Sequence, residues 1–312
     1  MANNKINKLK NFRKVSPSIS GTFDFTDTFD FDLGQIDLSS AFEDLYISND
    51  AKLFLGRFSE KDMYSKIEAI GLLKHLKAMG FSVIHMDIDR DENYINYLKL
   101  YWEDKTPENL LLDLRVSEHT FIPDKQFFEE GFRIEPYNMI LIEWLSAKNP
   151  RAVFDNNRPQ LPGQSSPGLG ILKYCFQLLY NISSEVFKDG FLDIPTYMHS
   201  AIMYSKEFKF FDPVQEAILR AAKRDLKGYS LADISWGVIT ETIIDVHKKQ
   251  PAVYDPGEQI HYVSNRMKEY FESKLYVTTF NKYYTRKKYY FKYQEMVRKR
   301  KEILLTRKIE DL

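Results

Sequence analysis

Two glycines stand directly before an apolar, helix-like segment, in the stretch "SSPGLGILK" that runs from 165 to 173. Because Gly168 and Gly170 have no Cβ atom, the backbone around them can approach a ligand closely. The helix that follows begins with unpaired peptide N–H groups and with the positive end of its dipole. This combination predicts a phosphate or pyrophosphate site at the turn around Gly168 and Gly170. A tight turn that needs glycine for its own geometry is the alternative interpretation.

A second group of polar residues lies where a strand-like segment ends, in "DLRVSEHTFIP" (113–123). Polar side chains at a strand end often line a site. Glu118 and His119 in this segment, and Glu143 further along the chain, are candidate general bases. A hydrogen-bonded structural histidine and a surface glutamate are the alternatives.

The residues that usually hold metals are scarce and scattered. The six histidines stand singly and Cys175 is the only cysteine, so no intrachain disulfide can form and we expect no metal site. Cys175 follows Tyr174 in an apolar segment, which is typical of a small core residue rather than of a nucleophile.

The charges balance overall but are unevenly placed. Lys plus Arg and Asp plus Glu both number 44, so the net charge indicates no class of partner. Residues 15–51 contain acids but no Lys or Arg, whereas residues 282–308 contain eleven Lys or Arg and two Glu. The segment "YYTRKKYYFKYQEMVRKRK" (283–301) interleaves aromatic and basic residues. An amphipathic helix docked on the core, which we favour, a nucleic-acid surface and a membrane surface all fit this pattern.

Length and hydropathy bound the class of protein. A chain of 312 residues that is 44% hydrophobic can bury a sizeable core. It has no apolar run of 18 residues and no apolar segment of the kind that export needs. We therefore expect a cytoplasmic protein without a membrane span.

Hydrophobic spacing predicts the elements that must position these residues. A helix is expected over 59–79, capped by Ser59 and Asp62, followed by three strands at 81–89, 94–102 and 109–117 that short polar links join into antiparallel hairpins. Further helices are expected at 137–149, 169–188, 197–208, 212–228 and 230–249 and from 264 onward, with a short strand at 191–195.

These elements predict an α/β (α+β) protein, with a mixed, largely antiparallel central sheet flanked by helices and a helical C-terminal part. We expect an acidic-aromatic, partly disordered N-terminal arm at 1–50, an α/β core at 51–262, and a basic aromatic helical extension at 263–312.

The order of a helix, a three-stranded meander, a glycine turn, a helix, a short strand and a helix resembles the GNAT N-acetyltransferases, over Leu53 to Phe211. That family holds the pyrophosphate of acetyl-CoA on a turn with the pattern Gln/Arg-x-x-Gly-x-Gly/Ala. The glycines of 168–170 fit this pattern, while Ser165 occupies the position of the Gln or Arg and Gln164 lies one residue earlier.

A later pattern of the family, Leu-Tyr-x-Lys-x-Gly-Phe, is matched in part by "MYSKEFKF", which supplies Met203, Tyr204 and Lys206. The expected Gly-Phe is absent, because Glu207 and Phe208 follow instead. The chain also departs in spacing: about 50 residues separate the last meander strand from the turn, whereas the family has its strand run almost directly into it.

By this resemblance, the peptide N–H groups of Leu169, Gly170 and Ile171 would bind the pyrophosphate of acetyl-CoA, with Gln164 and Ser165 beside it, and Tyr204 would protonate the leaving thiolate. The implied function is transfer of an acetyl or acyl group from acyl-CoA to an unknown amine. The alternative is a non-catalytic binding or scaffold protein that engages nucleic acid or a protein through its basic aromatic C-terminal end. The oligomeric state stays open.

Overall fold

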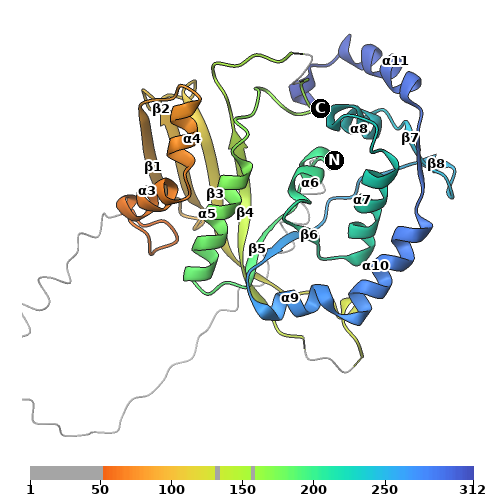
Figure 1. Ribbon diagram of the computed structural model, residues 1–312, viewed down its shortest axis with the longest axis horizontal. Helices are drawn as coiled ribbons and strands as arrows, with labels where there is room; N and C mark the ends of the chain where they lie inside the picture. Colours follow the sequence, from red (N-terminus) through yellow and green to blue (C-terminus); the bar gives the residue numbers. More distant parts are fainter. Residues whose placement is uncertain (1–51, 131–133, 156–158) are drawn as a thin grey trace, which may run out of the picture. The chain divides into compact units, whose positions relative to one another are not determined.

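The structure, a computed structural model, describes residues 52–130, 134–155 and 159–312, so the predicted arm at 1–50 lies outside the described residues. Leu53–Leu312 forms one compact unit. Its main sheet has seven strands in the order β1-β2-β3-β4-β5-β9-β6, with helices packed against it (Figure 1). The predicted fold class is confirmed. In the part of the chain that the structure describes, no helix is long and apolar enough to cross a membrane.

The helix predicted over 59–79 is divided into α3 (Glu60–Ala69) and α4 (Leu72–Ala78). Ser59 caps α3 as predicted, because its hydroxyl accepts a hydrogen bond from the Asp62 N–H and the Asp62 carboxylate accepts one from the Ser59 N–H. Gly71 separates the two helices with a φ of 81°, a left-handed conformation that glycine adopts without strain. The apolar spacing continues across Gly71, so the sequence does not reveal that the helix is interrupted there.

Four strands form an antiparallel meander: β1 (Ile84–Arg90), β2 (Asn96–Trp102), β3 (Leu110–Phe121) and β4 (Tyr137–Ala147). The first three confirm the predicted hairpins. The helix predicted over 137–149 is wrong, because this segment is β4. Its apolar run 139–142 is buried on both faces, since β4 lies in the middle of the sheet between β3 and β5. Periodicity alone does not distinguish such a central strand from a buried helix.

The predicted strand at 191–195 is present as β5 (Gly190–Asp193), which pairs with β4 in parallel over only three residues. The last pair is Leu141 with Leu192. Beyond Leu141, β4 continues to Ala147 without a β5 partner, and Lys148 forms an isolated antiparallel bridge with Gly168. We call the point after Leu141 the strand divergence. The sheet is completed by β9 (Gln259–Tyr262), antiparallel to β5 and to β6 (Lys209–Phe210).

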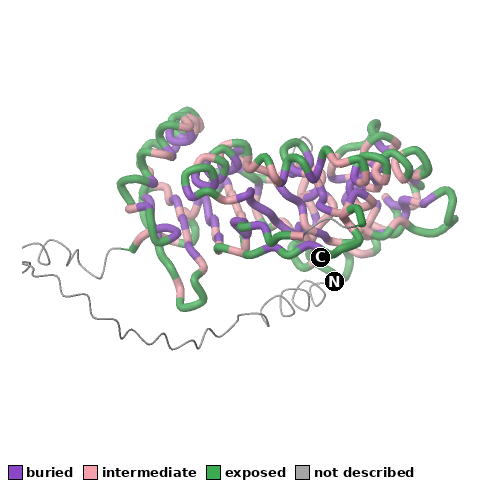
Figure 2. The backbone as a smooth tube through the Cα atoms, turned by 90° about the horizontal axis from the view of Figure 1, so that it is seen from below, coloured by how far each residue is buried: buried purple, intermediate pink, exposed green. Residues whose placement is uncertain are grey.

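Two hydrophobic clusters cover the two faces of the main sheet. One contains Val116 and Ile142 with buried residues of α3, α4 and α5 (Leu172–Glu185), and we call this side the α5 face. The other contains Met139 and Leu141 with residues of α9 (Asn265–Glu272), and we call it the α9 face. Figure 2 shows how buried and exposed residues alternate along the helices that pack on this core.

The remaining predicted helices are largely present, with shifted ends. They are α6 (Met198–Tyr204), α7 (Pro213–Asp225), α8 (Leu231–Ile239), α9, α10 (Lys274–Arg286) and α11 (Tyr293–Leu304). The helix predicted over 230–249 is too long, because its second half leaves the helix for a small sheet. That three-stranded sheet consists of β7 (Ile243–Asp245), β8 (Gln250–Pro251) and β10 (Tyr289–Phe291).

Candidate functional site

The glycine turn, Pro167–Ile171, lies between the end of β4 and the start of α5 (Figure 1). Leu169 and Ile171 are buried and anchor the turn in the core, whereas Gly168 and Gly170 are exposed. Gly170 has a φ of 69° and open space where a Cβ atom would stand. The turn therefore holds its side chains inside and presents its two bare backbone positions outward.

The peptide N–H groups of Gly168, Gly170 and Ile171 donate no hydrogen bond to any residue that the structure describes, whereas the Leu169 N–H faces the Ala147 carbonyl within the bridge to Lys148. The neighbouring carbonyl of Pro167 is paired, since it accepts from the Asn149 N–H at 2.8 Å. No side chain caps α5. Unpaired N–H groups at a helix N-terminus are normally satisfied by a side chain, water or a ligand. The backbone arrangement predicted from the sequence is thus one that can accept an anion.

Gln164 and Ser165 lie just before the turn. The Gln164 side-chain oxygen accepts a hydrogen bond from the Leu161 N–H at 3.1 Å, which holds Gln164 within its own loop, and Ser165 is exposed. A pocket of about 290 Å³ borders this region, lined by Gln164 and Gly168 and by the start of α8. The turn therefore has an opening beside it.

Tyr204 ends α6 on the α5 face, where it packs edge-on against Phe176 with ring centroids 5.1 Å apart. Burial raises the pKa of Tyr204 well above its usual value, and the charge of Asp193 and a hydrogen bond with that carboxylate raise the pKa further. The phenol is therefore protonated at neutral pH and can act as a proton donor. Asp193 is the residue of β5 directly after the last pair with β4. Tyr204 thus stands beside the strand divergence.

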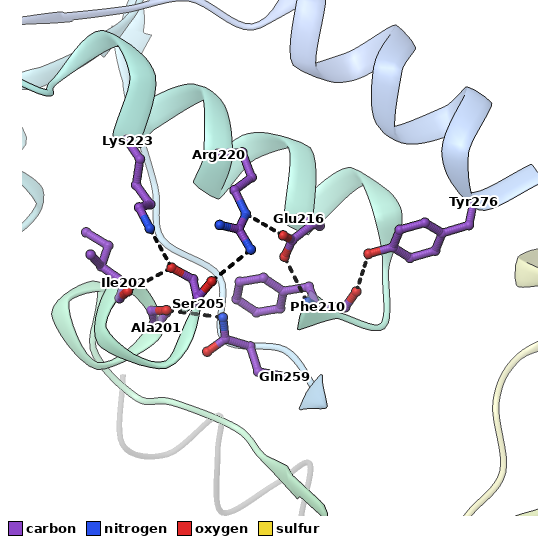
Figure 3. Close-up of polar contacts among 9 residues, drawn as sticks. All are labelled: Ala201, Ile202, Ser205, Phe210, Glu216, Arg220, Lys223, Gln259 and Tyr276. Atoms are coloured by element: carbon purple, nitrogen blue, oxygen red, sulfur yellow. Dashed lines mark hydrogen bonds and ion pairs between the residues drawn. The ribbon is translucent and has the colours of Figure 1, made fainter. Parts of the chain in front are cut away.

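A set of hydrogen bonds holds the end of α6 in place (Figure 3). We call it the α6–α7 network; it comprises Ala201, Ile202, Ser205, Phe210, Glu216, Arg220, Lys223, Gln259 and Tyr276. Arg220 donates to the Ser205 carbonyl at 2.8 Å, and Gln259 donates to the Ala201 carbonyl at 3.2 Å. Because Tyr204 is the last residue of this helix, the network fixes the position of its ring.

The centre of the network is the buried carboxylate of Glu216. It accepts hydrogen bonds from the Arg220 guanidinium at 2.6 Å and from the Phe210 N–H at 2.9 Å. The Tyr276 hydroxyl donates to the Phe210 carbonyl at 2.8 Å, which links α10 to the same turn. These bonds connect α6, β6, α7 and α10 through one buried charge.

The network also contains a serine beside a lysine, an arrangement that can form a nucleophile. The Lys223 ammonium lies 2.7 Å from the Ser205 hydroxyl, and burial, followed by the neighbouring Arg220, lowers the pKa of Lys223. However, Ser205 is only 1% exposed and its hydroxyl donates to the Ile202 carbonyl at 2.7 Å. We therefore interpret this pair as structural.

Two of the three candidate bases lie together on the α9 face. Ser117, His119 and Glu143 alternate with residues of the opposite cluster, and the Ser117 hydroxyl donates to Glu143 at 2.9 Å. Burial lowers the pKa of His119, while the charge of Glu143 opposes that shift. Glu143 is the extra residue of a β-bulge, opposite Arg115 and Val116, two positions beyond Leu141. A neutral imidazole and a carboxylate therefore lie on the same face of the sheet, on either side of the strand divergence.

Glu118 lies on the other side of the sheet. Its carboxylate pairs with the Lys188 ammonium at 2.6 Å, after the end of α5. Tyr204 also lies on the α5 face, so the sheet separates both residues from His119 and Glu143.

Sequence reasoning missed Asp193 and the role of Ser117. In the sequence, Asp193 is the acid that ends the short apolar strand "FLD". Its position matters because β4 is the parallel neighbour of this strand, and β4 was predicted to be a helix. Ser117 stood in the polar cluster, yet its partner Glu143 is 26 residues away and was placed on that same helix.

The remaining candidate groups take structural positions. Cys175 is buried, and burial raises the pKa of its thiol to about 12, so it is not a nucleophile at neutral pH. Across the residues that the structure describes, no group of three or more His, Cys, Asp or Glu is arranged to hold a metal ion.

The basic aromatic segment 283–301 packs on the core through its apolar residues. Tyr289, Phe291 and Met296 are buried in one cluster with Trp236 of α8. The basic residues of the segment face outward for the most part, as Lys288 and Arg298 do.

Comparison with known proteins finds no match among protein-family models, curated proteins or solved structures. The candidate site is therefore interpreted from its own geometry.

Proposed function

We propose that this chain is an acyl-CoA-dependent N-acyltransferase, which acts in the cytoplasm on an amine of unknown structure. The observation that carries the proposal is the glycine turn, whose N–H groups at 168, 170 and 171 are unpaired among the described residues, and which bridges to Lys148 on the stretch of chain that continues β4 beyond the strand divergence. By the resemblance to the GNAT enzymes, the pantetheine arm would lie along this stretch, between the turn and the strand divergence.

The residues of the turn fit the diphosphate of coenzyme A. The N–H groups of Gly168, Gly170 and Ile171 would hold the pyrophosphate, and the uncapped N-terminus of α5 adds a favourable dipole. Lys173, exposed in the first turn of α5, places a positive charge near the same end. When bound, acyl-CoA supplies a thioester, whose C–S bond breaks as the N–C bond of the amide forms.

The α9 face provides the groups that an amine requires. A protonated amine is drawn to the Glu143 carboxylate, which Ser117 holds by a hydrogen bond. His119 accepts the proton, because its lowered pKa leaves the imidazole neutral at pH 7. On the α5 face, Tyr204 donates a proton to the departing sulfur and regains one from water. The strand divergence is where these two sides share a site.

Binding of acetyl-CoA tests this proposal. Free ligand at 100 times its Kd stabilises a protein by about 2.7 kcal/mol, so we expect a rise of several degrees in Tm. Gly168→Val should abolish that rise and the heat of binding in calorimetry, because its side chain covers the N–H groups. The fold should survive, since a Cβ atom at Gly168 lies in ordinary contact, 3.7 Å from the Ala147 carbonyl oxygen.

Gly228→Val is the matched control. Gly228 is exposed, has open space around its Cβ position, and lies in the loop before α8. This variant should bind acetyl-CoA like the wild type. No stabilisation of the wild type, or equal stabilisation of the Gly168→Val variant, would contradict the proposal.

The basic surface of the C-terminal segment supports a second candidate function, nucleic-acid binding. Arg286, Lys288 and Lys301 are exposed. Because 283–301 packs on the core, truncation would damage the fold, and charge reversal at these positions is the cleaner test. Salt-dependent retention on oligonucleotides that Lys288→Glu and Lys301→Glu remove would support this function.

A further inference from the structure

A second pocket lies at the edge of the main sheet, away from the glycine turn. Its volume is about 380 Å³, and it extends around the ends of β6 and β9 to the start of α9. Its principal lining residues are Tyr180, Lys206, Lys209, His261, Tyr262 and Lys268. None of the residues that line it belongs to the glycine turn or to the pocket beside that turn.

The pocket carries an excess of positive charge. Lys206, Lys209 and Lys268 line it, with Glu207 as the one acid of the lining. Among the described residues, neither Lys206 nor Lys209 forms an ion pair, and Lys268 approaches Glu272 only at 3.8 Å. The Lys209 ammonium instead lies over the rings of Tyr262 and Phe271, 5.9 and 5.6 Å from their centroids. Three ammonium groups around one cavity favour a ligand with several negative charges.

His261 adds an unused polar atom. Its Nδ1 is buried and has no hydrogen-bond partner among the described residues, while its ring stacks on Phe191 with centroids 4.7 Å apart. Leaving a buried donor or acceptor unpaired is unfavourable, and such atoms in native structures usually have an explanation, such as water or a ligand. Tyr180 packs edge-on against the same ring at 5.7 Å, which gives the pocket an aromatic wall.

The start of α9 completes the pocket. Ser264 caps this helix by accepting from the Met267 N–H, and it also donates to Asp189, so its hydroxyl is occupied. The N–H of Asn265, which lines the pocket, donates no bond to a described residue. The helix therefore directs its positive end and a backbone donor toward the lysines.

We propose that this pocket binds a small molecule that bears a phosphate or pyrophosphate group, at a site separate from the glycine turn. The lysines neutralise the charge, the backbone N–H of Asn265 and the imidazole of His261 offer directed hydrogen bonds, and Tyr180 and Tyr262 contact the rest of the ligand. The site is independent of the proposed acyl transfer, because it uses none of the residues assigned to that reaction.

Calorimetry with inorganic pyrophosphate tests the proposal, with the Gly168→Val variant as the background that removes the glycine turn. We expect this variant to keep one pyrophosphate site, whose affinity falls roughly tenfold on Lys206→Gln or Lys209→Gln, as expected for a lost charge-assisted hydrogen bond. Lys74→Gln is the control, because Lys74 is exposed and lies outside the pocket. Inorganic phosphate and citrate as further probes distinguish phosphate recognition from simple attraction of carboxylates.

The outcomes separate the two proposals. Pyrophosphate binding that the lysine substitutions leave unchanged, or that Gly168→Val alone abolishes, would overturn the second site, as would citrate binding as tight as that of pyrophosphate. Acetyl-CoA binding by Lys209→Gln should equal that of the wild type. A tenfold loss there would place the pocket within the cofactor site and contradict its independence. Failure of acetyl-CoA to bind any variant would affect only the proposed acyl transfer.

Discussion

The α6–α7 network and the glycine turn are two polar regions that the chain treats in opposite ways. In the network, the Glu216 carboxylate is buried and paired with Arg220 and with the Phe210 N–H. In the turn, the N–H groups of Gly168, Gly170 and Ile171 have no partner among the described residues, and both glycines are exposed. Buried polar groups that pair with one another position a structure, whereas exposed, unpaired donors are available to a ligand.

The same contrast explains why charge alone is a poor guide to function here. Glu216, Arg220 and Lys223 are a conspicuous cluster of ionisable groups, yet the hydrogen bonds within the protein occupy them. The turn has no charged residue between Pro167 and Ile171, and its capacity for an anion comes from the backbone. We therefore expect stability to depend on the α6–α7 network and ligand binding to depend on the glycine turn.

The largest effect is expected from Glu216→Ala. Removing the buried carboxylate leaves Arg220 and the Phe210 N–H without their partner, which should lower the free energy of unfolding by about 3 kcal/mol. Denaturant unfolding measures this change. The folded fraction should bind acetyl-CoA with unchanged affinity, and an affinity loss as large as the stability loss would erase the distinction between the regions.

A second effect comes from His199, another buried group with a protein partner. Its Nδ1 lies 2.8 Å from the Ser235 hydroxyl, and burial lowers the pKa of His199 to about 4. Above pH 6.5 the imidazole is neutral in both states. Below that value the imidazole of the unfolded chain binds a proton, whereas that of the folded protein stays neutral. The free energy of unfolding therefore falls as pH drops from 6.5 toward 4.

Between pH 7 and pH 4.5, His199 should lower the free energy of unfolding by about 2.5 kcal/mol. We expect His199→Gln to lose less stability than the wild type over that range, whatever its stability at pH 7. Urea unfolding at the two pH values gives the comparison. Equal losses for both proteins would show that His199 is not held neutral by the fold.

His119→Gln addresses the reaction itself. Loss of a general base lowers a rate by about a hundredfold or more, so acetyl transfer to an amine should slow by that factor while acetyl-CoA still binds. The wild-type rate should fall as pH drops through the lowered pKa of His119, below 6.5, and the variant should lack this fall. Thr120→Ala, an exposed neighbour on β3, is the control. An unchanged rate in the His119→Gln variant would remove His119 from the mechanism.

The smallest effect is expected from alanine substitutions that compare a glycine needed only for backbone conformation with a glycine that also contributes to ligand binding. Gly71 and Gly170 both have positive φ, 81° and 69°, and open space at the Cβ position. Alanine at either should cost about 1 kcal/mol of stability. Only Gly170→Ala should also weaken acetyl-CoA binding, by a few fold in calorimetry. Equal affinities for the two variants would mean that Gly170 serves the turn alone.

Several parts of this arrangement were readable from the sequence. The Ser59–Asp62 cap and the alternation of apolar residues in β3 follow from local pattern, and both are present. The glycines at 168 and 170 marked the turn and the start of α5, because positive φ and close backbone approach are local requirements. The type and spacing of these residues were enough to mark the glycine turn as a candidate site.

The rest depended on contacts that no local pattern encodes. The run 139–142 became a strand because β3 and β5 flank it, and the sequence carries no local mark of those neighbours. The strand divergence arises because β5 is only four residues long, whereas β4 has eleven. The grouping of Ser117, His119 and Glu143 follows from the β3–β4 register and from the bulge at Glu143, neither of which could be derived once 137–149 was taken as a helix.

A titration of the ¹⁵N-labelled protein with coenzyme A, followed through its backbone amide signals, tests the central claim most directly. We expect the amide signals of Gly168, Gly170 and Ile171 to shift downfield as their N–H groups gain an anionic acceptor. The amide of Phe210, already bonded to Glu216, should stay in place. Shifts confined to other parts of the chain, or none at millimolar coenzyme A, would contradict the assignment of the turn as a pyrophosphate site.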